Sequence, residues 1–308
     1  MENIRQRLAT RLRILADLLS PPRSTPSPIP QVVTDSSPKS DAPTAAATPE
    51  IIERFLHSPP QNVEVVTDQD SLQRLVNVTA ATWTQLGKQK AHWSVLTWPE
   101  YLLAEIDEAR FFQTGADSFM EVSRFFERSA LSIPDDDCVL ELGCGVGRVT
   151  KQLATHFQAV TAVDISAPHL SLAAKYMGSS GLTNVRFVQL RRPADLDEIP
   201  QVGFFYSIIV LQHNPPPVAF DLLRRCLSRV KSGGFAFFQI PTFKRDYCFT
   251  VESYAPDKNG RMEMHVIPQA KLLSLLQQSG FEILELQEDG MVGDPNMVSH
   301  TFFARRHA

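Results

Sequence analysis

The sequence lacks the features that mark several common classes of protein. It has four cysteines in 308 residues and no C-x-x-C pair, which argues against a zinc knuckle or a redox dithiol and suits a reducing compartment. No apolar run approaches the roughly 20 residues that span a bilayer. The formal net charge of −4 is not the basic surplus of a general nucleic-acid binder. We therefore expect a weakly acidic, cytoplasmic protein that binds no nucleic acid.

Two kinds of composition precede the part of the chain that is expected to fold. Residues 1–19 place leucines at near-helical spacing among arginines, which predicts an amphipathic helix rather than a signal peptide. Such a helix either contacts a membrane surface or a partner protein, or is an ordinary solvated helix. Residues 20–67 are rich in proline, with ten of the 22 prolines between Pro21 and Pro60. This composition predicts a flexible linker and a folded body that begins near Asp68.

The pattern of apolar residues changes within the part of the chain that is expected to fold. Residues 68–133 show helical spacing and hold all three tryptophans, which predicts a helical preface that either packs as core or forms a lid over a pocket. From residue 134 to residue 308 apolar strands alternate with helices, and this alternation predicts an α/β domain with a mostly parallel sheet covered on both faces. The predicted strands are 139–142, 159–163, 185–188, 204–211, 235–240, 281–286 and 299–304, and the predicted helices are 148–156, 167–177, 218–230 and 268–278.

The first predicted strand ends in a glycine-rich turn, Glu141-Leu142-Gly143-Cys144-Gly145-Val146-Gly147. Glycine allows a ligand to approach the backbone closely, at the edge where open α/β sheets bind ligands. The second strand leads to Asp164, whose carboxylate can accept hydrogen bonds from a ribose, and to Ile165, which offers an apolar face to an adenine. The acid Glu141 would repel the pyrophosphate of a dinucleotide. It suits instead the cationic amino-acid end of S-adenosylmethionine (SAM).

These motifs resemble those of the class I methyltransferases, which bind SAM on a Rossmann-like fold. Segments 139–148, 163–166 and 231–234 are similar to three family motifs in order and spacing. The resemblance implies a seven-stranded sheet whose last strand inserts antiparallel. It also implies that Glu141, Gly143 and Gly145 line the methionine moiety and that Asp164 meets the ribose. The full set of predicted cofactor contacts is Glu141, Gly143, Cys144, Gly145, Gly147, Asp164, Ile165 and Leu211.

The sequence departs from this family after the third strand. Many members carry an acid there that meets the adenine amino group, whereas this chain reads Leu190-Arg191-Arg192, with Asp195 a little later. The adenine contact is therefore left open.

Two histidines are the predicted catalytic residues. His213 follows the fourth strand, which faces the methyl group of the cofactor in the resembling fold. A neutral imidazole there either takes a proton from an attacking hydroxyl or shapes the cleft. His265 lies in the long connection 241–268, which is expected either to overhang the donor site or to pack on the helical preface. His213, Glu263 and His265 lack the spacing of metal ligands, so no metal is predicted.

Further stretches, 211–216, 239–242 and 262–269, are similar to bacterial methyltransferases of cell-surface glycan gene clusters. This similarity favours methylation of a hydroxyl group on a glycan or a small molecule. Two alternatives stay open. One is N-methylation of a small amine, and the other is a cofactor-binding partner protein without catalytic activity.

Overall fold

The computed structural model describes residues 61–103, 105–257 and 261–308, so the predicted helix over residues 1–19 and the linker up to residue 60 lie outside the described residues. The helical elements are α3 (Gln69–Gln89), α4 (Ala91–Val95), η1 (Pro99–Leu102), α5 (Glu108–Arg128), α6 (Thr150–His156), α7 (Ala167–Ser179), η2 (Pro193–Glu198), η3 (Leu211–His213), α8 (Pro216–Arg229) and α9 (Gln269–Gln278). The strands are β1 (Cys138–Leu142), β2 (Ala159–Asp164), β3 (Val185–Gln189), β4 (Val202–Ser207), β5 (Val230–Lys244), β6 (Phe281–Asp289) and β7 (Met297–Arg306).

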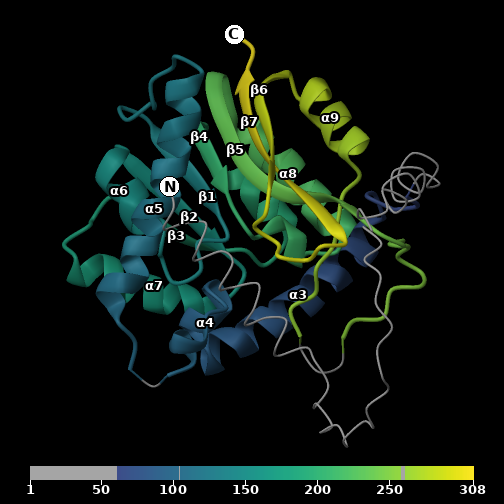
Figure 1. Ribbon diagram of the computed structural model, residues 1–308, viewed down its shortest axis with the longest axis horizontal. Coiled ribbons are helices and arrows are strands. Elements are labelled where there is room, and N and C mark those ends of the chain that lie inside the picture. Colours follow the sequence, from purple (N-terminus) through teal and green to yellow (C-terminus); the bar gives the residue numbers. More distant parts are fainter. Residues whose placement is uncertain (1–60, 104, 258–260) are drawn as a thin grey trace, which may run out of the picture. The chain divides into compact units, whose positions relative to one another are not determined.

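The strands form a seven-stranded sheet in the order β3-β2-β1-β4-β5-β7-β6 (Figure 1). The pairs from β3 to β5 are parallel, and β7 runs antiparallel to both of its neighbours, β5 and β6. Parallel pairs need crossover connections, which the helical elements between these strands supply. The predicted Rossmann-like sheet with an antiparallel inserted strand is therefore confirmed, and so is the helical region that precedes it.

Both faces of the sheet are buried because apolar side chains alternate between them along the central strands. Leu140 and Phe205 belong to a core that α8 and α9 cover. Val139 and Phe204 belong to a second core that α5 and α6 cover. Figure 1 shows these two layers of helices on opposite sides of the strands.

Two predicted strand boundaries were wrong. The fourth strand was expected over 204–211 but ends at Ser207, and Leu211 and His213 lie in the short helix η3. The apolar run continues past the point where the pairing with β5 stops, at Ser207 and Phe238, so hydrophobicity alone could not locate the end. The fifth strand was expected over 235–240 but extends over Val230–Lys244, so the motif 231–234 lies inside β5, where the register with β4 shifts.

Helix α3 lies across the carboxyl ends of β2 and β3. It begins at the N-cap Asp68, whose carboxylate accepts the Ser71 amide hydrogen at 2.9 Å. Farther along, the Gln73 side chain donates to the Arg191 carbonyl after β3 at 3.0 Å. The Trp83 carbonyl accepts a hydrogen bond from the Ser166 hydroxyl after β2, also at 3.0 Å. The helical preface therefore covers the sheet edge where the glycine-rich turn lies.

The folded body begins before Asp68. Val63 bridges Phe249 in the connection between β5 and α9, and both side chains are buried. The Glu64 amide donates to the Phe249 carbonyl and the Phe249 amide donates to the Asn62 carbonyl, each at 2.9 Å. Residues 62–65 thus belong to the body rather than to the linker. Among the described helices, none has the length and apolar character needed to span a membrane.

Candidate active site

The glycine-rich turn after β1 has the backbone that a close ligand contact requires. Gly143, Gly145 and Gly147 adopt φ angles of +76°, +54° and +85°, a region that residues with a Cβ rarely adopt. The amide groups of Gly143 and Cys144 donate to the Val163 carbonyl of β2 at 2.7 and 3.0 Å. The turn is therefore fixed to the neighbouring strand, with Cys144 buried beneath it.

Two buried carboxylates flank this turn. The side chain of Glu141 on β1 is 3% exposed and accepts a hydrogen bond from the Thr150 hydroxyl at 2.6 Å. Asp164 at the end of β2 accepts the Gly145 and Ser166 amide hydrogens, each at 2.8 Å. A carboxylate offers about four lone pairs, so Asp164 can still accept hydrogen bonds from a diol.

Burial raises the pKa of both acids. The pKa of Glu141 rises to about 7 because desolvation outweighs the Thr150 hydrogen bond. Burial likewise raises the pKa of Asp164, against the opposing effects of His169 and of the two amide groups. Within residues 61–103, 105–257 and 261–308, no lysine or arginine forms an ion pair with either acid. Arg148 acts on Glu141 through space and lowers its pKa, but burial outweighs this effect. Two buried acids that form no direct ion pair with a lysine or arginine suit a ligand that is itself a cation.

Two valines lie over the turn. A Cβ built on Gly143 would collide with the Val210 side chain, and one built on Gly145 would collide with the Val95 side chain of α4. The glycines therefore provide the depth that SAM needs, and the acids provide the matching charge and hydrogen-bond acceptors. The residues therefore fit this cofactor, and Val95 of α4 occupies the space directly over Gly145.

His213 stands in η3, three residues after Val210. Its Nδ1 donates to the Glu263 carbonyl at 2.9 Å, and the Trp83 ring lies 5.3 Å away between centroids. Burial lowers the pKa of His213 to about 4, and the hydrogen bond to Glu263 only partly offsets this. The imidazole is thus neutral at physiological pH, and its Nε2 carries the lone pair.

His265 lies beside His213 but is held differently. Its Nδ1 contacts the Tyr247 hydroxyl at 2.8 Å, and its Nε2 contacts the Glu263 carboxylate at 3.0 Å. The His265 amide donates to the Gln212 carbonyl of η3 at 2.8 Å. The long connection between β5 and α9 therefore reaches η3, and both ring nitrogens of His265 are engaged within it.

Glu263 is the centre of that connection. Its carboxylate accepts hydrogen bonds from the Tyr254 hydroxyl at 2.8 Å and from the Asp257 amide at 2.6 Å, besides the contact with His265. Burial alone would raise the pKa of Glu263, but these donors together lower it to about 2. Glu263 is thus ionised and holds the segment against η3.

The other predicted contacts are placed in different surroundings. Ile165 is partly buried next to Asp164, and the Cβ that Gly147 lacks would meet Met177 of α7. Leu211 is fully buried in the core under α8. Asp195 accepts the amide hydrogens of Arg191 and Arg192 at 2.9 and 3.0 Å, so this acid caps the turn after β3.

Sequence reasoning missed one link of the site. His169 contacts the Ser166 hydroxyl through Nδ1 at 2.7 Å and the Ser94 hydroxyl of α4 through Nε2 at 2.8 Å. Trp83 of α3 lies against the same ring. This buried histidine therefore ties α4 to the end of β2. Its partners come from segments about 75 residues apart, so no local pattern could reveal it.

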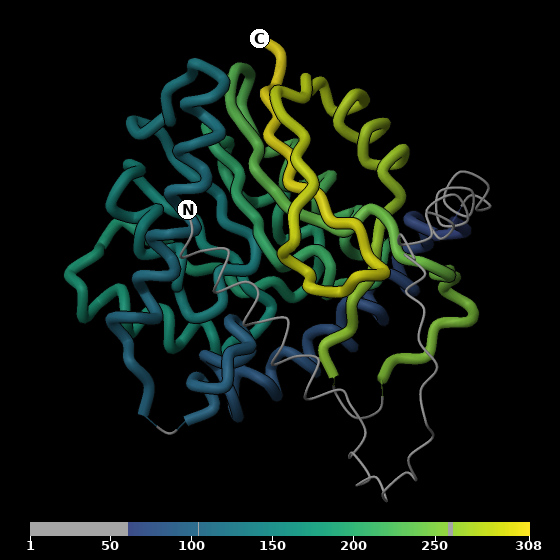
Figure 2. The backbone as a smooth tube through the Cα atoms, viewed as in Figure 1, coloured from purple at the N-terminus to yellow at the C-terminus, as the bar shows by residue number. Residues whose placement is uncertain are grey.

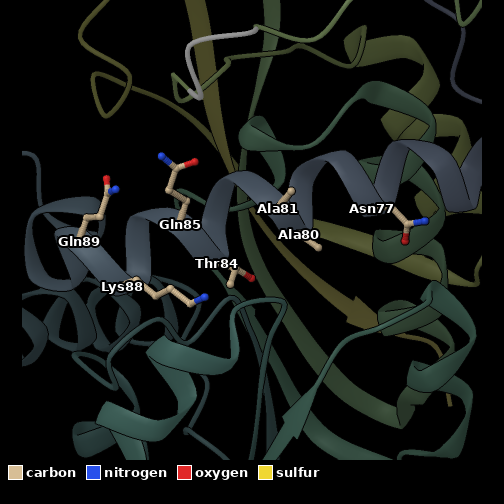
Figure 3. Close-up of a pocket in the computed structure, with 7 residues that line it drawn as sticks. All are labelled: Asn77, Ala80, Ala81, Thr84, Gln85, Lys88 and Gln89. Atoms are coloured by element: carbon tan, nitrogen blue, oxygen red, sulfur yellow. The ribbon is translucent and has the colours of Figure 1, made fainter.

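A separate hollow runs along the exposed side of α3 (Figure 3). Its described lining consists of Asn77, Ala80, Ala81, Thr84, Gln85, Lys88 and Gln89. These residues carry one charge and no acid, so the hollow offers none of the chemistry found at the glycine-rich turn. Across the described ranges, no group of three or more His, Cys, Asp or Glu side chains is arranged to hold a metal ion.

The fold and a family match define the class of this domain. Residues 139–234 match the family model described as a methyltransferase domain. The fold is similar to that of a magnesium protoporphyrin IX methyltransferase from Synechocystis PCC 6803 solved with bound SAM, with a TM-score of 0.51. That alignment has 16% sequence identity and covers 79% of this chain and 100% of the other. Residues 139–234 therefore form a methyltransferase domain within a methyltransferase fold.

Part of the chain is also similar in sequence to curated proteins that are named as O-methyltransferases. A ubiquinone biosynthesis O-methyltransferase from Pseudomonas fluorescens is 33% identical over 101 residues, which is 32% of this chain and 42% of the relative. The protein of the same name from Stutzerimonas stutzeri is 30% identical over 115 residues, 37% of this chain and 48% of the relative. The chain thus spans less than half the length of these relatives.

Proposed function

We propose that this protein is a SAM-dependent methyltransferase that methylates a hydroxyl group of a small molecule or a glycan. The observation that carries the proposal is a neutral histidine on η3, three residues from the valine that lies on Gly143, beside a turn flanked by two buried acids. The similarity to O-methyltransferases supports a hydroxyl acceptor.

Each group has a defined task in this proposal. When bound, SAM supplies an electrophilic methyl group on a positively charged sulfur. Glu141 would orient the ammonium end of the cofactor, and Asp164 would accept hydrogen bonds from the ribose hydroxyls. His213 would hold the hydroxyl proton at Nε2 as the acceptor oxygen bonds to the methyl carbon. We assign this role to His213 rather than to His265, because Tyr247 and Glu263 engage the ring nitrogens of His265 at 2.8 and 3.0 Å, whereas the contact of His213 Nε2 with Gln212 is longer, at 3.4 Å.

The first test is cofactor binding by calorimetry with SAM and its demethylated product. We expect both to bind, and we expect Asp164→Asn to weaken both, because an amide replaces one acceptor by a donor. Absence of binding to the intact chain would refute the cofactor assignment. It would also refute the alternative of a cofactor-binding partner protein.

The second test is methyl transfer from labelled SAM to a panel of sugars, phenols and amines. With a hydroxyl acceptor we expect His213→Ala to lower kcat by about 10²-fold or more, because the proton loses its acceptor. The control His156→Ala removes an exposed histidine of α6 and should leave kcat unchanged. A slight loss in His213→Ala together with an amine substrate would favour N-methylation. Binding without transfer to any acceptor would favour the non-catalytic partner.

A further inference from the structure

A chain of buried amides connects the sheet to His213. Gln239 of β5 and Gln212 of η3 are 0% and 3% exposed. The Ile209 amide donates to Gln239 Oε1 at 3.0 Å, and Gln239 Nε2 donates to Gln212 Oε1 at 3.0 Å. Gln212 Nε2 in turn lies 3.4 Å from His213 Nε2. This series of hydrogen-bond contacts thus runs from the backbone amide of Ile209 to the ring of His213.

The direction of this chain is fixed at its two ends. At one end the Ile209 amide can only donate, so the carbamoyl oxygen of Gln239 must face it and its nitrogen must face Gln212. Gln212 then turns its own nitrogen toward His213. At the other end the Glu263 carbonyl can only accept, so His213 Nδ1 must carry the proton. Both ends demand the same tautomer.

A third contact of Gln239 does not set this direction. Gln239 Nε2 also donates to the Ser299 hydroxyl of β7 at 2.6 Å. A hydroxyl can rotate and serve as donor or acceptor, so Ser299 would accommodate either orientation of the amide. Removing the Ser299 hydroxyl therefore costs a buried hydrogen bond but leaves the direction of the chain intact.

We propose that Gln239 and Gln212 are positioning residues that keep the proton of His213 on Nδ1 and present Nε2 as the acceptor of the substrate proton. The contact at Nε2 is long, so an acceptor hydroxyl replaces it readily. This inference rests on the proposed function for its catalytic part, whereas the tautomer of His213 is a property of the protein alone.

The test is ¹⁵N NMR of the histidine-labelled full chain, with the His213 signal assigned by its loss in His213→Ala. The wild type should show His213 as the neutral Nδ1–H form at pH 7. In Gln239→Glu the side chain can no longer donate, so Gln212 turns its oxygen toward His213. We expect the proton to appear on Nε2, or on both nitrogens, and kcat at pH 7 to fall about 10²-fold. The acid limb of the kcat profile should move to higher pH.

Three further variants separate the effect of the hydrogen-bond direction from the effects of lost packing and of added charge. Ser299→Ala should lower the unfolding temperature and keep the Nδ1–H form with wild-type kcat. Gln239→Met removes the direction of the hydrogen-bond chain without adding charge. The Glu263 carbonyl then favours the Nδ1–H form without help from Gln212, so we expect a smaller share of Nε2–H than in Gln239→Glu. Gln212→Glu presents an oxygen to Nε2 and should reproduce Gln239→Glu, which covers the case in which one of these variants does not fold.

The outcomes are distinct. An unchanged Nδ1–H form in folded Gln239→Glu or Gln212→Glu would overturn the positioning role. A changed tautomer with undiminished methyl transfer would leave the hydrogen-bond chain standing and would overturn the role of His213 as base, and with it that part of the proposed function.

Discussion

At the scale of single residues, Ile209 has a backbone conformation that β-branched residues rarely adopt. Its φ angle is +58°, and its amide hydrogen is bound by the buried Gln239. Such a conformation costs about 1–3 kcal/mol and persists only where the surroundings impose it. The side chain is 37% exposed at the end of β4, close to the glycine-rich turn. The strained conformation of Ile209 therefore lowers the free energy of unfolding, and it lies in the segment that carries Val210 and leads into η3.

Replacing Ile209 by glycine tests this strain. Glycine adopts a positive φ without steric cost, so Ile209→Gly should be about 1 kcal/mol more stable than Ile209→Ala, the reverse of the order expected at a residue of ordinary φ. The free energies of unfolding of the two variants in urea give the comparison. Equal losses in the two variants would show that Ile209 is unstrained.

Glu141→Gln tests the charge of the cofactor site. The pKa of Glu141 is raised to about 7, above its ordinary value of 4.5, so the folded protein binds a proton that the unfolded chain releases between these two pH values. The contribution of Glu141 to stability is therefore present below pH 4.5 and is lost as pH rises to about 7. The amide variant lacks this loss and should be more stable than the wild type above pH 7.

The same substitution should weaken cofactor binding. In the proposed function, the cationic end of SAM would lose a charge-assisted hydrogen bond to Glu141, and we expect Kd to rise about tenfold. Thermal unfolding from pH 4 to pH 9 and calorimetry with SAM measure the two effects. A variant that is less stable than the wild type at pH 8, or that binds SAM equally well, would contradict the placement of Glu141.

At the scale of elements, α4 is the segment that we expect a bound cofactor to displace, because its Val95 lies over Gly145. It has five residues, and Ser94 ties it to His169. Val95→Ala removes the two methyl groups that lie over Gly145, so we expect Kd for SAM to fall roughly threefold to tenfold, at a stability cost of about 1 kcal/mol. Val78→Ala on α3 is the matched control and should leave Kd unchanged. A higher Kd in Val95→Ala would mean that Val95 supports the cofactor rather than covering its place.

Elements could be predicted where neighbouring residues in the sequence determine them, and could not be predicted where contacts between distant residues do. The glycine-rich turn and Asp164 were predictable because each follows a short buried strand with a recognisable spacing. The end of β4 was not, because the apolar run 208–211 continues after the pairing with β5 has ended. The contact between η3 and the long connection from β5 to α9 could not be predicted either. The hydrogen bond from His213 to Glu263 joins residues that are 50 positions apart in the sequence.

At the scale of the whole molecule, residues 61–308 form one compact unit. The first described residue buried in its core is Val63, and the described core clusters are built from this residue and those after it. We therefore expect a chain of residues 61–308 to unfold cooperatively at nearly the temperature of the full chain and to bind SAM with the same Kd. Calorimetric scans and titrations of the two proteins provide the measurement. A large drop in either quantity would assign residues 1–60 a structural role in the fold.

The position of β7 affects how the protein is made. In Figure 2 the chain passes through β6 and then returns as β7, which pairs with β5 on one side and β6 on the other. During translation β5 and β6 therefore leave the ribosome before the strand that joins them. Until residues 297–306 follow, β5 keeps an open edge and Phe238 lacks the ring of Phe302 that stacks on it at 4.9 Å. Open edges recruit strands from other chains. The nascent protein therefore exposes this edge from the emergence of β5 until that of β7, and a chaperone bound during this interval would protect it from aggregation.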